Sequence, residues 1–300
     1  MSLVSAERAD RDLALRTAAR PPSDTGQRIT RKALAYAALL AVAVVALVPF
    51  AWMLSTSFKS VKELFIFPPK WIPDKLLFSN YTDLWKLFPM SRWLWNSFYI
   101  TTLITVGVLA TSALSAYAFA RIDFPGRELI FYAFLATLMI PDMVYLVPKF
   151  ALIQKLNWYN THTALIVPAL ASAFGVFLLR QFFLTIPKEL EEAARIDGAG
   201  HWRIFTRIVL PLAGPALATL AVFTFIGTWN DFINPLLFLD DVKLYTAQLG
   251  LSYLKDQHSS IVNYNRQMAG DVITLIPMIV VFVAAQKYYV RGIALTGTKG

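Results

Sequence analysis

Residues 95–120 read WNSFYITTLITVGVLATSALSAYAFA, and no charged side chain occurs between Arg92 and Arg121. A helix that crosses the hydrocarbon core of a bilayer needs about 20 predominantly apolar residues, which this stretch supplies. The rest of the chain has the same character, because 57% of its 300 residues are hydrophobic and only 16% are charged. Soluble domains average about 45–50% apolar and about 25% charged residues. The composition therefore predicts an integral membrane protein.

Six stretches are long and apolar enough to be predicted as membrane-spanning helices. They cover about residues 33–57, 95–120, 129–150, 163–184, 212–239 and 272–290. Pro141 interrupts the third, Arg180 lies near the end of the fourth and Asp231 lies late in the fifth. The predicted fold class is an all-α membrane protein with six transmembrane helices in one domain, residues 33–291. A loosely ordered extension (1–32) is expected before it and a short tail (292–300) after it.

The distribution of Lys and Arg predicts the orientation in the membrane. An even number of spans places both termini on one side. If that side is the cytoplasm, 17 of the 28 Lys and Arg residues fall on cytoplasmic segments and the remaining 11 (28 − 17) on external ones. Because Lys and Arg accumulate on the cytoplasmic side, both termini and the segment after the fourth span are expected to be cytoplasmic.

Several functional classes are disfavoured by the residues present. The chain has no cysteine, and its three histidines are far apart without ligand spacing, so no metal site is expected. The net charge is +9, and seven of the 28 Lys and Arg residues lie in residues 1–32 while the others are scattered at segment edges. This distribution suits anionic lipid headgroups better than nucleic acid. The nearest approach to a phosphate-binding loop, residues 292–299, ends in Thr-Lys and leaves no room for the helix that such a loop needs. No catalytic activity and no cofactor of its own are expected.

A charged segment, PKELEEAARIDGAGHWRIFTRIVLP, occupies residues 187–211 between the fourth and fifth predicted spans. Pro187 suits the first turn of a helix, and Glu189, Glu191 and Glu192 complement the helix dipole there. Gly198 is expected to end this short helix in the left-handed conformation.

A second short helix is expected over about residues 201–210, closed by Pro211. Trp202, Phe205, Ile208 and Val209 would share one apolar face of it. The spacing alone does not decide between two surroundings for that face. It either lies on the headgroups or the protein's own helices, or it docks on a partner.

This segment resembles the EAA loop of ABC-importer membrane subunits, whose pattern is E-A-A-x-x-x-G, nine residues, then I-x-L-P. Residues 192–198 (EAARIDG) and 208–211 (IVLP) match it in residue type and spacing. Residues 117–121 (YAFAR), 124–127 (FPGR), 139–141 (MIP), 229–232 (WNDF) and the tail 292–300 resemble the maltose-type carbohydrate-importer permeases. The similarity runs from about Ala33 to the C-terminus.

In that family the loop is a coupling helix that sits in a cleft of a separate cytoplasmic ATPase. The resemblance implies that Glu192 pairs with a base of the ATPase, that Gly198 provides the turn and that the Trp202 and Phe205 face fills the cleft. The full set of coupling residues it implies is Glu191, Glu192, Ala193, Ala194, Asp197, Gly198, Trp202, Arg203, Phe205 and Pro211.

Polar residues near the outer end of the fifth span are candidates for the solute pathway, because polar groups at membrane depth usually face a cavity or another helix. Asn230, Asp231 and Asn234 could hydrogen-bond sugar hydroxyls while Trp229 or Phe232 stacks on an apolar face of the sugar. Capping and packing are the alternative role for these residues. Asp142, next to Pro141 in the third span, is either a pathway group or the partner of a nearby base.

The resemblance implies a prokaryotic cell-membrane permease subunit of an ATP-driven importer for a di- or oligosaccharide. It implies a second permease subunit, two copies of an ATPase that binds ATP and Mg, and an external solute-binding protein. A polyol or glycerol phosphate is the alternative solute within this class. An ion-gradient-driven transporter and a membrane scaffold are the rival classes, although the scaffold leaves the EAA pattern unexplained.

Overall fold

The computed structural model describes residues 25–257 and 264–296. The expectations for residues 1–24 and for the last four residues of the tail lie outside this range. The chain divides into two compact units, Met1–Met53 and Leu54–Gly300, and each is described by itself.

The described part of the first unit consists of helix α2 (Thr25–Ser57), which contains Pro49 and ends within the second unit. From Thr30 onward this helix is long and apolar enough to cross a membrane, and none of its most apolar window is buried. Leu34 and Val45, for example, are 72% and 71% exposed. A helix that is apolar all round and unburied has its natural environment in a bilayer.

The second unit contains the remaining helices of the described chain. Its α-helices are α3 (Ser79–Leu87), α4 (Met90–Arg121), α5 (Arg127–Ala136), α6 (Leu146–Lys155), α7 (Thr163–Ala169), α8 (Ala173–Thr185), α9 (Lys188–Ile196), α10 (His201–Ile204), α11 (Leu210–Leu212), α12 (Gly214–Trp229), α13 (Ile233–Phe238), α14 (Ala247–Gln257) and α15 (Tyr264–Thr296). Short helical turns are η1 (Val61–Phe65), η2 (Thr137–Met139), η3 (Asp142–Tyr145) and η5 (Val242–Leu244), and η4 (Phe205–Val209) is a π-helical stretch. The described residues contain no strand.

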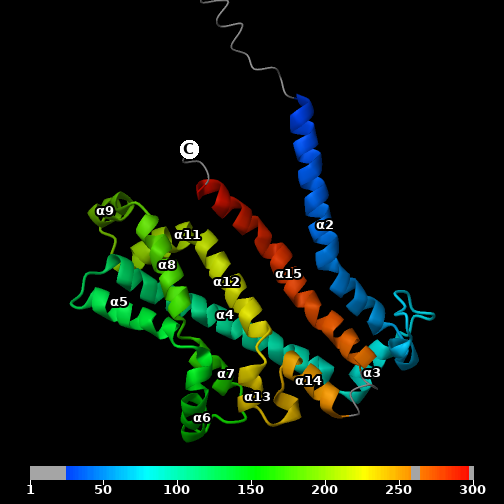
Figure 1. Cartoon of the computed structure of the whole chain (residues 1–300). Helices are drawn as coiled ribbons and strands as arrows, with labels where there is room; N and C mark the ends of the chain where they lie inside the picture. Colours follow the sequence, from blue (N-terminus) through cyan, green and yellow to red (C-terminus); the bar gives the residue numbers. More distant parts are fainter. Residues whose placement is uncertain (1–24, 258–263, 297–300) are drawn as a thin grey trace, which may run out of the picture. The chain divides into compact units, whose positions relative to one another are not determined.

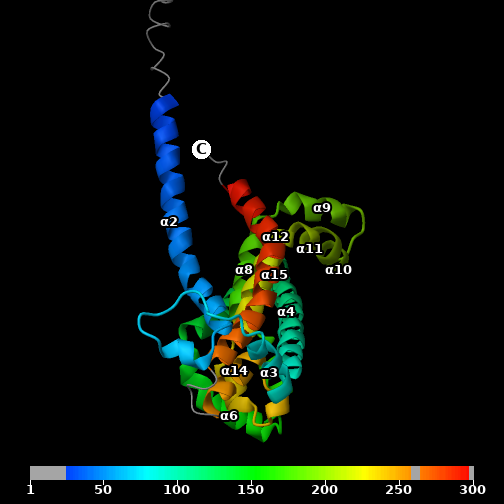
Figure 2. The ribbon, with the colours of Figure 1, turned by 90° about the vertical axis from the view of Figure 1, so that its right-hand side faces the viewer.

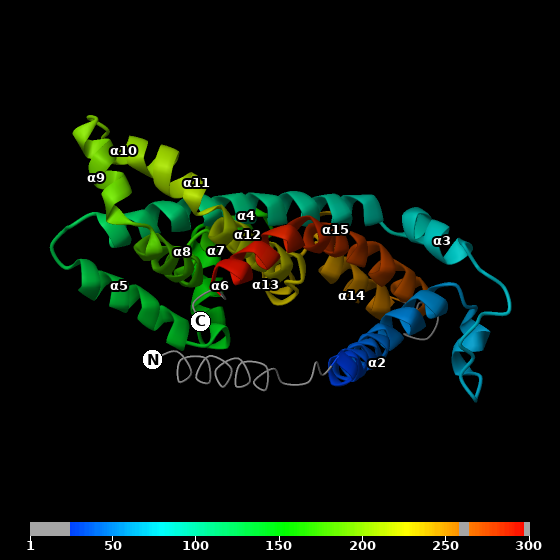
Figure 3. The same cartoon turned by 90° about the horizontal axis from the view of Figure 1, so that it is seen from above.

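Helix α4 is at the centre of this unit. Helices α8 and α12 pack on α4, and α15 packs on α12; Figure 3 shows α4 running alongside α12. The larger apolar core joins α4 to α7, α8 and the α10–α13 segment. A smaller one joins α3, α4, α14 and α15 around Trp93 and Leu254.

Four helical segments of the described chain are each long and apolar enough to span a membrane, and up to six spans result if each of two bent pairs counts as one. These four candidates are Thr30–Ser57, Met90–Arg121, Tyr264–Ala284 and Thr163–Thr185, the last of which contains both α7 and α8. The sequence predicts an interruption at Pro141, and the chain bends there by 93° between Arg127–Met139 and Asp142–Lys155. A second bend, of 75°, separates His201–Leu212 from Gly214–Trp229.

Three element boundaries differ from the expected ones. The stretch 163–184 is two helices, because α7 ends at Ala169 and α8 begins at Ala173. The stretch 212–239 also divides, into α12 and α13. The last helix is longer than expected, since α15 begins at Tyr264 and continues to Thr296, into the expected tail.

At one end of the second unit, α4 holds the connection between α13 and α14. Trp93 donates through Nε1 to the Val242 carbonyl at 2.8 Å, and Asn96 donates to the Lys243 carbonyl at 2.9 Å. His162 joins the same site, because its Nε2 lies 2.7 Å from the Leu244 carbonyl oxygen and its Nδ1 meets the Tyr99 hydroxyl. Helices α9 to α11 lie at the opposite end of the unit (Figures 1 and 2).

Candidate functional site: the α9–α11 hairpin and its attachment

The segment that matches the EAA pattern folds as a helical hairpin. Helix α9 follows Pro187 and has Glu189 and Glu191 in its first turn, where acidic side chains are favoured by the helix dipole. Gly198 has φ of 79°, the left-handed conformation predicted from the sequence. Its N–H donates to the Arg195 carbonyl at 3.0 Å, and the Ala199 N–H donates to the Ala194 carbonyl at 2.9 Å. These two bonds form a Schellman motif, which ends α9 and turns the chain into α10.

A buried ion pair attaches α9 to α4. Arg121 Nε lies 2.9 Å from Glu191 Oε1, and the two side chains are only 3% and 5% exposed. The same guanidinium donates through Nη2 to the Phe183 carbonyl at 2.5 Å and to the Ile186 carbonyl at 2.6 Å. Arg121 therefore joins the last turn of α4 to the end of α8 and to the start of α9.

The position of Glu191 differs from the expectation. It was grouped with the residues that contact a partner, but it faces the protein's own interior. The sequence assigns no role to its partner Arg121. The available signal was that Arg121 is the first charge after a long uncharged run, a place where a base is either solvated or paired.

The apolar face expected on the second helix is divided between two directions. Phe205 is 5% exposed and its ring lies 5.1 Å from that of Tyr117 on α4, so it anchors the hairpin to the core. Val209 is buried as well. Trp202 is 68% exposed, although its ring centroid lies 5.7 Å from that of Phe205. The face expected to fill a partner's cleft is thus reduced to Trp202.

The backbone of the second helix is irregular after Phe205. Residues Phe205–Val209 are π-helical, and the Leu210 N–H donates to the Phe205 carbonyl, five residues back. The wider turn rotates the side chains that follow relative to an α-helix. Pro211 does not end the helix, as was expected, but lies within α11, and the 75° bend comes after Leu212.

The outward surface of the hairpin combines charged and small residues with two large apolar ones. Ile196 is 87% exposed at the end of α9, and Trp202 follows across the turn. The remaining exposed members of the expected coupling set are Glu192, Ala193, Asp197, Gly198, Arg203 and Pro211, whereas Ala194 is half-buried. Ile196 was not singled out from the sequence, because its exposure depends on how α9 sits on the core.

A second charged network supports α8 beside the hairpin. Arg180, the base near the end of the fourth predicted span, is 2.9 Å from Glu128 of α5. Its guanidinium carbon lies 4.0 Å from the centre of the Phe131 ring. Burial of a guanidinium is tolerable when it is paired and stacked in this way.

The candidate pathway residues do not form one site. Trp229 is buried and donates through Nε1 to the Thr274 carbonyl of α15 at 3.1 Å. Asp231 accepts from Asn234 Nδ2 at 2.8 Å, and Asn234 Oδ1 accepts from Lys149 Nζ at 2.6 Å. Lys149 was not predicted, since it comes from α6, far away in the sequence.

The other two candidates are not members of that chain of hydrogen bonds. Asn230 donates to the Ile226 carbonyl of its own helix at 3.0 Å. Asp142 is exposed and accepts from the Tyr145 hydroxyl. Within the described residues, no cluster of His, Asp and Glu side chains could hold a metal ion.

Comparison with known proteins agrees with the hairpin's pattern. Residues 30–295 match the family model described as binding-protein-dependent transport system inner membrane component. The sn-glycerol-3-phosphate transport system permease protein of Yersinia enterocolitica is 40% identical over 237 residues, which are 77% of this chain and 84% of that protein. The arabinooligosaccharides transport system permease protein of Halalkalibacterium halodurans is 36% identical over 265 residues, 86% of this chain and 93% of that protein.

A solved structure shares the fold. A chain of a bacterial ABC transporter involved in the import of the acidic polysaccharide alginate superimposes with a TM-score of 0.76 at 25% identity, covering 90% of this chain and 99% of that one. The family match takes in the hairpin and nearly all the described helices. The chain therefore belongs to the family of binding-protein-dependent transport system inner membrane components.

Proposed function

We propose that this chain is one of two permease subunits of an ATP-driven sugar importer, and that the α9–α11 hairpin couples it to the ATPase. The observation that carries this proposal is the way the hairpin is built. Its turn exposes Ile196 and Trp202, while its base is fixed to α4 and α8 through the buried pair of Arg121 and Glu191. We call the exposed end of the hairpin, from Ile196 to Trp202, its tip. A partner that moves the tip would therefore also move α4 and α8.

The tip has the composition of a docking surface. Large apolar side chains exposed among charged ones usually mark a contact with another protein. Glu192 is exposed and available to pair with a base of the ATPase, as the family resemblance implies. In this proposal Trp202 and Ile196 enter the cleft, and Phe205 transmits force inward through its contact with Tyr117.

The proposed topology has six spans, with each of the two bent pairs counted as one. Both termini and the hairpin are placed in the cytoplasm, which the excess of Lys and Arg on those segments supports. ATP and Mg bind in two copies of a separate ATPase, and this chain has no catalytic role. A second permease subunit completes the pathway, and an external solute-binding protein delivers the solute.

The solute class is proposed from the relatives. The Halalkalibacterium protein is named for arabinooligosaccharides, and a diacetylchitobiose uptake permease of Streptomyces coelicolor is 34% identical over 257 residues, 85% of this chain and 85% of that protein. These names favour a neutral oligosaccharide. Glycerol phosphate is the second candidate, favoured by the 40% identity to the Yersinia glycerol-3-phosphate permease.

Reconstitution tests the proposal. The complex purified through this chain should contain an ATPase and a second permease subunit, and in liposomes it should take up solute when ATP and binding protein are supplied. Ionophores that collapse ion gradients should leave uptake unchanged. Uptake that needs a gradient and not ATP would instead favour a secondary transporter.

A further inference from the structure

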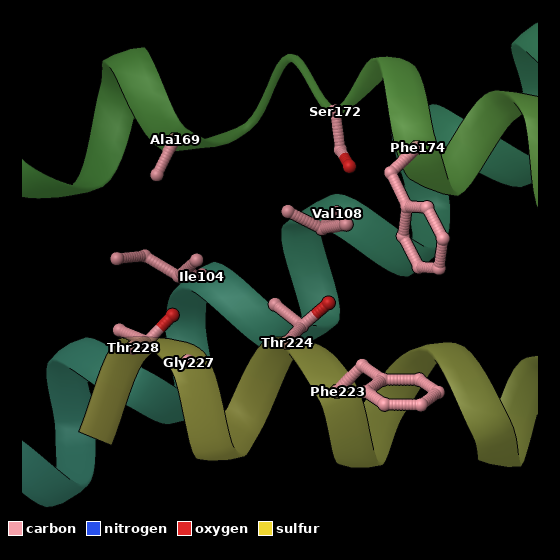
Figure 4. A pocket seen from close by; sticks show the side chains of 9 residues that line it. All are labelled: Ile104, Val108, Ala169, Ser172, Phe174, Phe223, Thr224, Gly227 and Thr228. Carbon is pink, nitrogen blue, oxygen red and sulfur yellow. The ribbon is translucent and has the colours of Figure 1, made fainter. Parts of the chain in front are cut away.

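A pocket of about 280 Å³ lies between α4, the break that separates α7 from α8, and α12 (Figure 4). Its α4 wall is formed by Ile104 and Val108, which are near the middle of the apolar helix Met90–Arg121. The pocket is therefore at membrane depth, well away from the hairpin. None of the residues predicted for the solute pathway lines it.

At the break that forms one wall, side chains bond to backbone groups that lack a partner within the helices. The Ser172 hydroxyl oxygen accepts from the Gly175 N–H at 3.0 Å and so caps α8. The Leu170 carbonyl accepts from the Thr111 hydroxyl of α4 at 2.7 Å. Non-helical backbone at membrane depth is tolerated where it is buried in protein or lines a water-filled cavity. The hydroxyl hydrogen of Ser172 remains available for donation, and Figure 4 shows this side chain directed toward the pocket.

Helix α12 contributes two further hydroxyls. Thr224 and Thr228 are four residues apart, hence on one face of the helix, and both point into the pocket (Figure 4). Among the described residues neither hydroxyl has a hydrogen-bond partner, whereas Thr219 on the same helix bonds back to the Pro215 carbonyl at 2.9 Å. A hydroxyl without a partner is costly in an apolar environment. The arrangement therefore favours a polar occupant.

Two aromatic rings border the hydroxyls. Phe174 and Phe223 meet edge to face with ring centroids 6.1 Å apart, and both are exposed. Hydroxyl donors and acceptors together with an aromatic face are suited to a sugar ring, which has polar edges and apolar C–H faces. No charged residue is among those that line the pocket, and an anionic solute would call for a base.

We propose that this pocket is a subsite of the transport pathway for one unit of a neutral sugar. Ser172, Thr224 and Thr228 bind its hydroxyls, and Phe174 and Phe223 border its apolar face. The inference rests on the proposed importer function and adds to it the position of the subsite and the class of solute. It assigns specificity for the solute to the start of α8 and to α12 of this subunit, and not to the hydrogen-bonded chain of Asp231, Asn234 and Lys149.

The first test removes the hydroxyls without changing side-chain volume. The complex is reconstituted with its ATPase and binding protein, and uptake of arabinotriose, N,N′-diacetylchitobiose and sn-glycerol 3-phosphate is measured. The double variant Thr224→Val/Thr228→Val should raise the apparent KM for a neutral sugar at least about tenfold, since two hydrogen bonds are lost. Thr219→Val is the matched control, because its hydroxyl bonds to its own helix, and its KM should equal that of the wild type.

The second test fills the pocket. A Cβ added at Gly227 meets no atom within 4 Å, so Gly227→Leu adds volume to the pocket without a clash at the backbone. It should abolish sugar uptake while leaving complex assembly and ATP hydrolysis intact. Gly227→Ala is the control and should transport nearly normally.

The outcomes separate the subsite from the importer role. ATP-driven sugar uptake by the wild type, with unchanged KM in the double variant and normal uptake by Gly227→Leu, overturns the subsite and leaves the importer role standing. Uptake by the wild type of glycerol 3-phosphate but of neither sugar overturns the assignment to a neutral solute. A wild-type complex without an associated ATPase overturns the proposed function itself.

Discussion

The Arg121 guanidinium lies 2.9 Å from the Glu191 carboxylate, and both side chains are almost completely buried. The pair joins the last residue of α4 to the first turn of α9. Because Arg121 also donates to two carbonyls at the end of α8, one side chain fixes the relative positions of three helices. In the proposed coupling role, movement of the hairpin would reach α4 and α8 through this pair.

Removal of Glu191 should therefore destabilise the protein and weaken coupling. Glu191→Ala leaves a buried guanidinium without its counter-charge, a loss of about 3–5 kcal/mol. Glu191→Gln retains a hydrogen-bond acceptor and should lose less. Thermal unfolding in detergent measures the effect, with Glu189→Ala as the control because Glu189 occupies the same turn and is exposed. Equal midpoints for Glu191→Ala and Glu189→Ala would show that the pair contributes nothing.

The turn of the hairpin allows a sharper comparison between two glycines. Gly198 has φ of 79°, where a side chain costs about 1–2 kcal/mol, whereas Gly200 has φ of −75° and is the N-cap residue of α10. Gly198→Asp should leave membrane insertion intact and uncouple ATP hydrolysis from uptake. Gly200→Asp adds the same group at a position where Asp is a favoured cap, and it should transport.

The measurement is the ratio of solute transported to ATP hydrolysed in the reconstituted complex. A normal ratio for Gly198→Asp would refute the coupling role of the hairpin. A low ratio for both variants would mean that negative charge at the turn, and not its backbone geometry, is what the ATPase rejects.

The sequence predicted the features of this hairpin that depend on local backbone chemistry. Gly198 could be placed in the left-handed region because a helix end followed by a reversal requires it. The apolar runs that become α2 and α4 could be recognised because a bilayer-spanning helix needs little besides length and apolarity.

Features that depend on packing between distant segments could not be predicted. Glu191 and Arg121 are 70 residues apart (191 − 121), and either could have faced solvent. Phe205 and Trp202 are expected on one face from the α-helical period, but only Phe205 packs against Tyr117 of α4, and the position of α4 beside the hairpin is not encoded in the local sequence. The sequence did not predict the break between Ala169 and Ala173. The Leu170 carbonyl at this break accepts a hydrogen bond from the Thr111 hydroxyl of another helix.

The exposed tip and the buried anchor of the hairpin should respond differently to truncation. Trp202→Ala and Ile196→Ser alter side chains that are already exposed, so the stability of the subunit should change by no more than about 0.5 kcal/mol. Binding of the ATPase should nevertheless weaken. Phe205→Ala removes a buried ring packed on Tyr117 and should cost about 3–5 kcal/mol.

The two effects are separated by measuring the unfolding midpoint of the chain and the amount of ATPase that copurifies with it. Loss of ATPase from Trp202→Ala at an unchanged midpoint supports docking through the tip. Full retention of the ATPase by the Trp202→Ala/Ile196→Ser double variant would place the contact elsewhere on the hairpin.

His162 should make stability depend on pH at the opposite end of the second unit. Its Nε2 faces the Leu244 carbonyl, which can only accept, so Nε2 carries the hydrogen and Nδ1 accepts from the Tyr99 hydroxyl. Burial lowers the pKa of this imidazole below its usual 6.5, the nearby Arg92 lowers the pKa further, and the hydrogen bond to Leu244 opposes both.

Since the folded state then holds fewer protons than the unfolded state, the contribution of His162 to stability is complete above about pH 6.5. It is lost as the pH falls through the lowered pKa. The unfolding midpoint in detergent should therefore drop on acidification below about pH 6.5, and the drop should be smaller in His162→Gln, which can still donate to Leu244 and accept from Tyr99. An identical pH profile for the two proteins would exclude His162 as the titrating group.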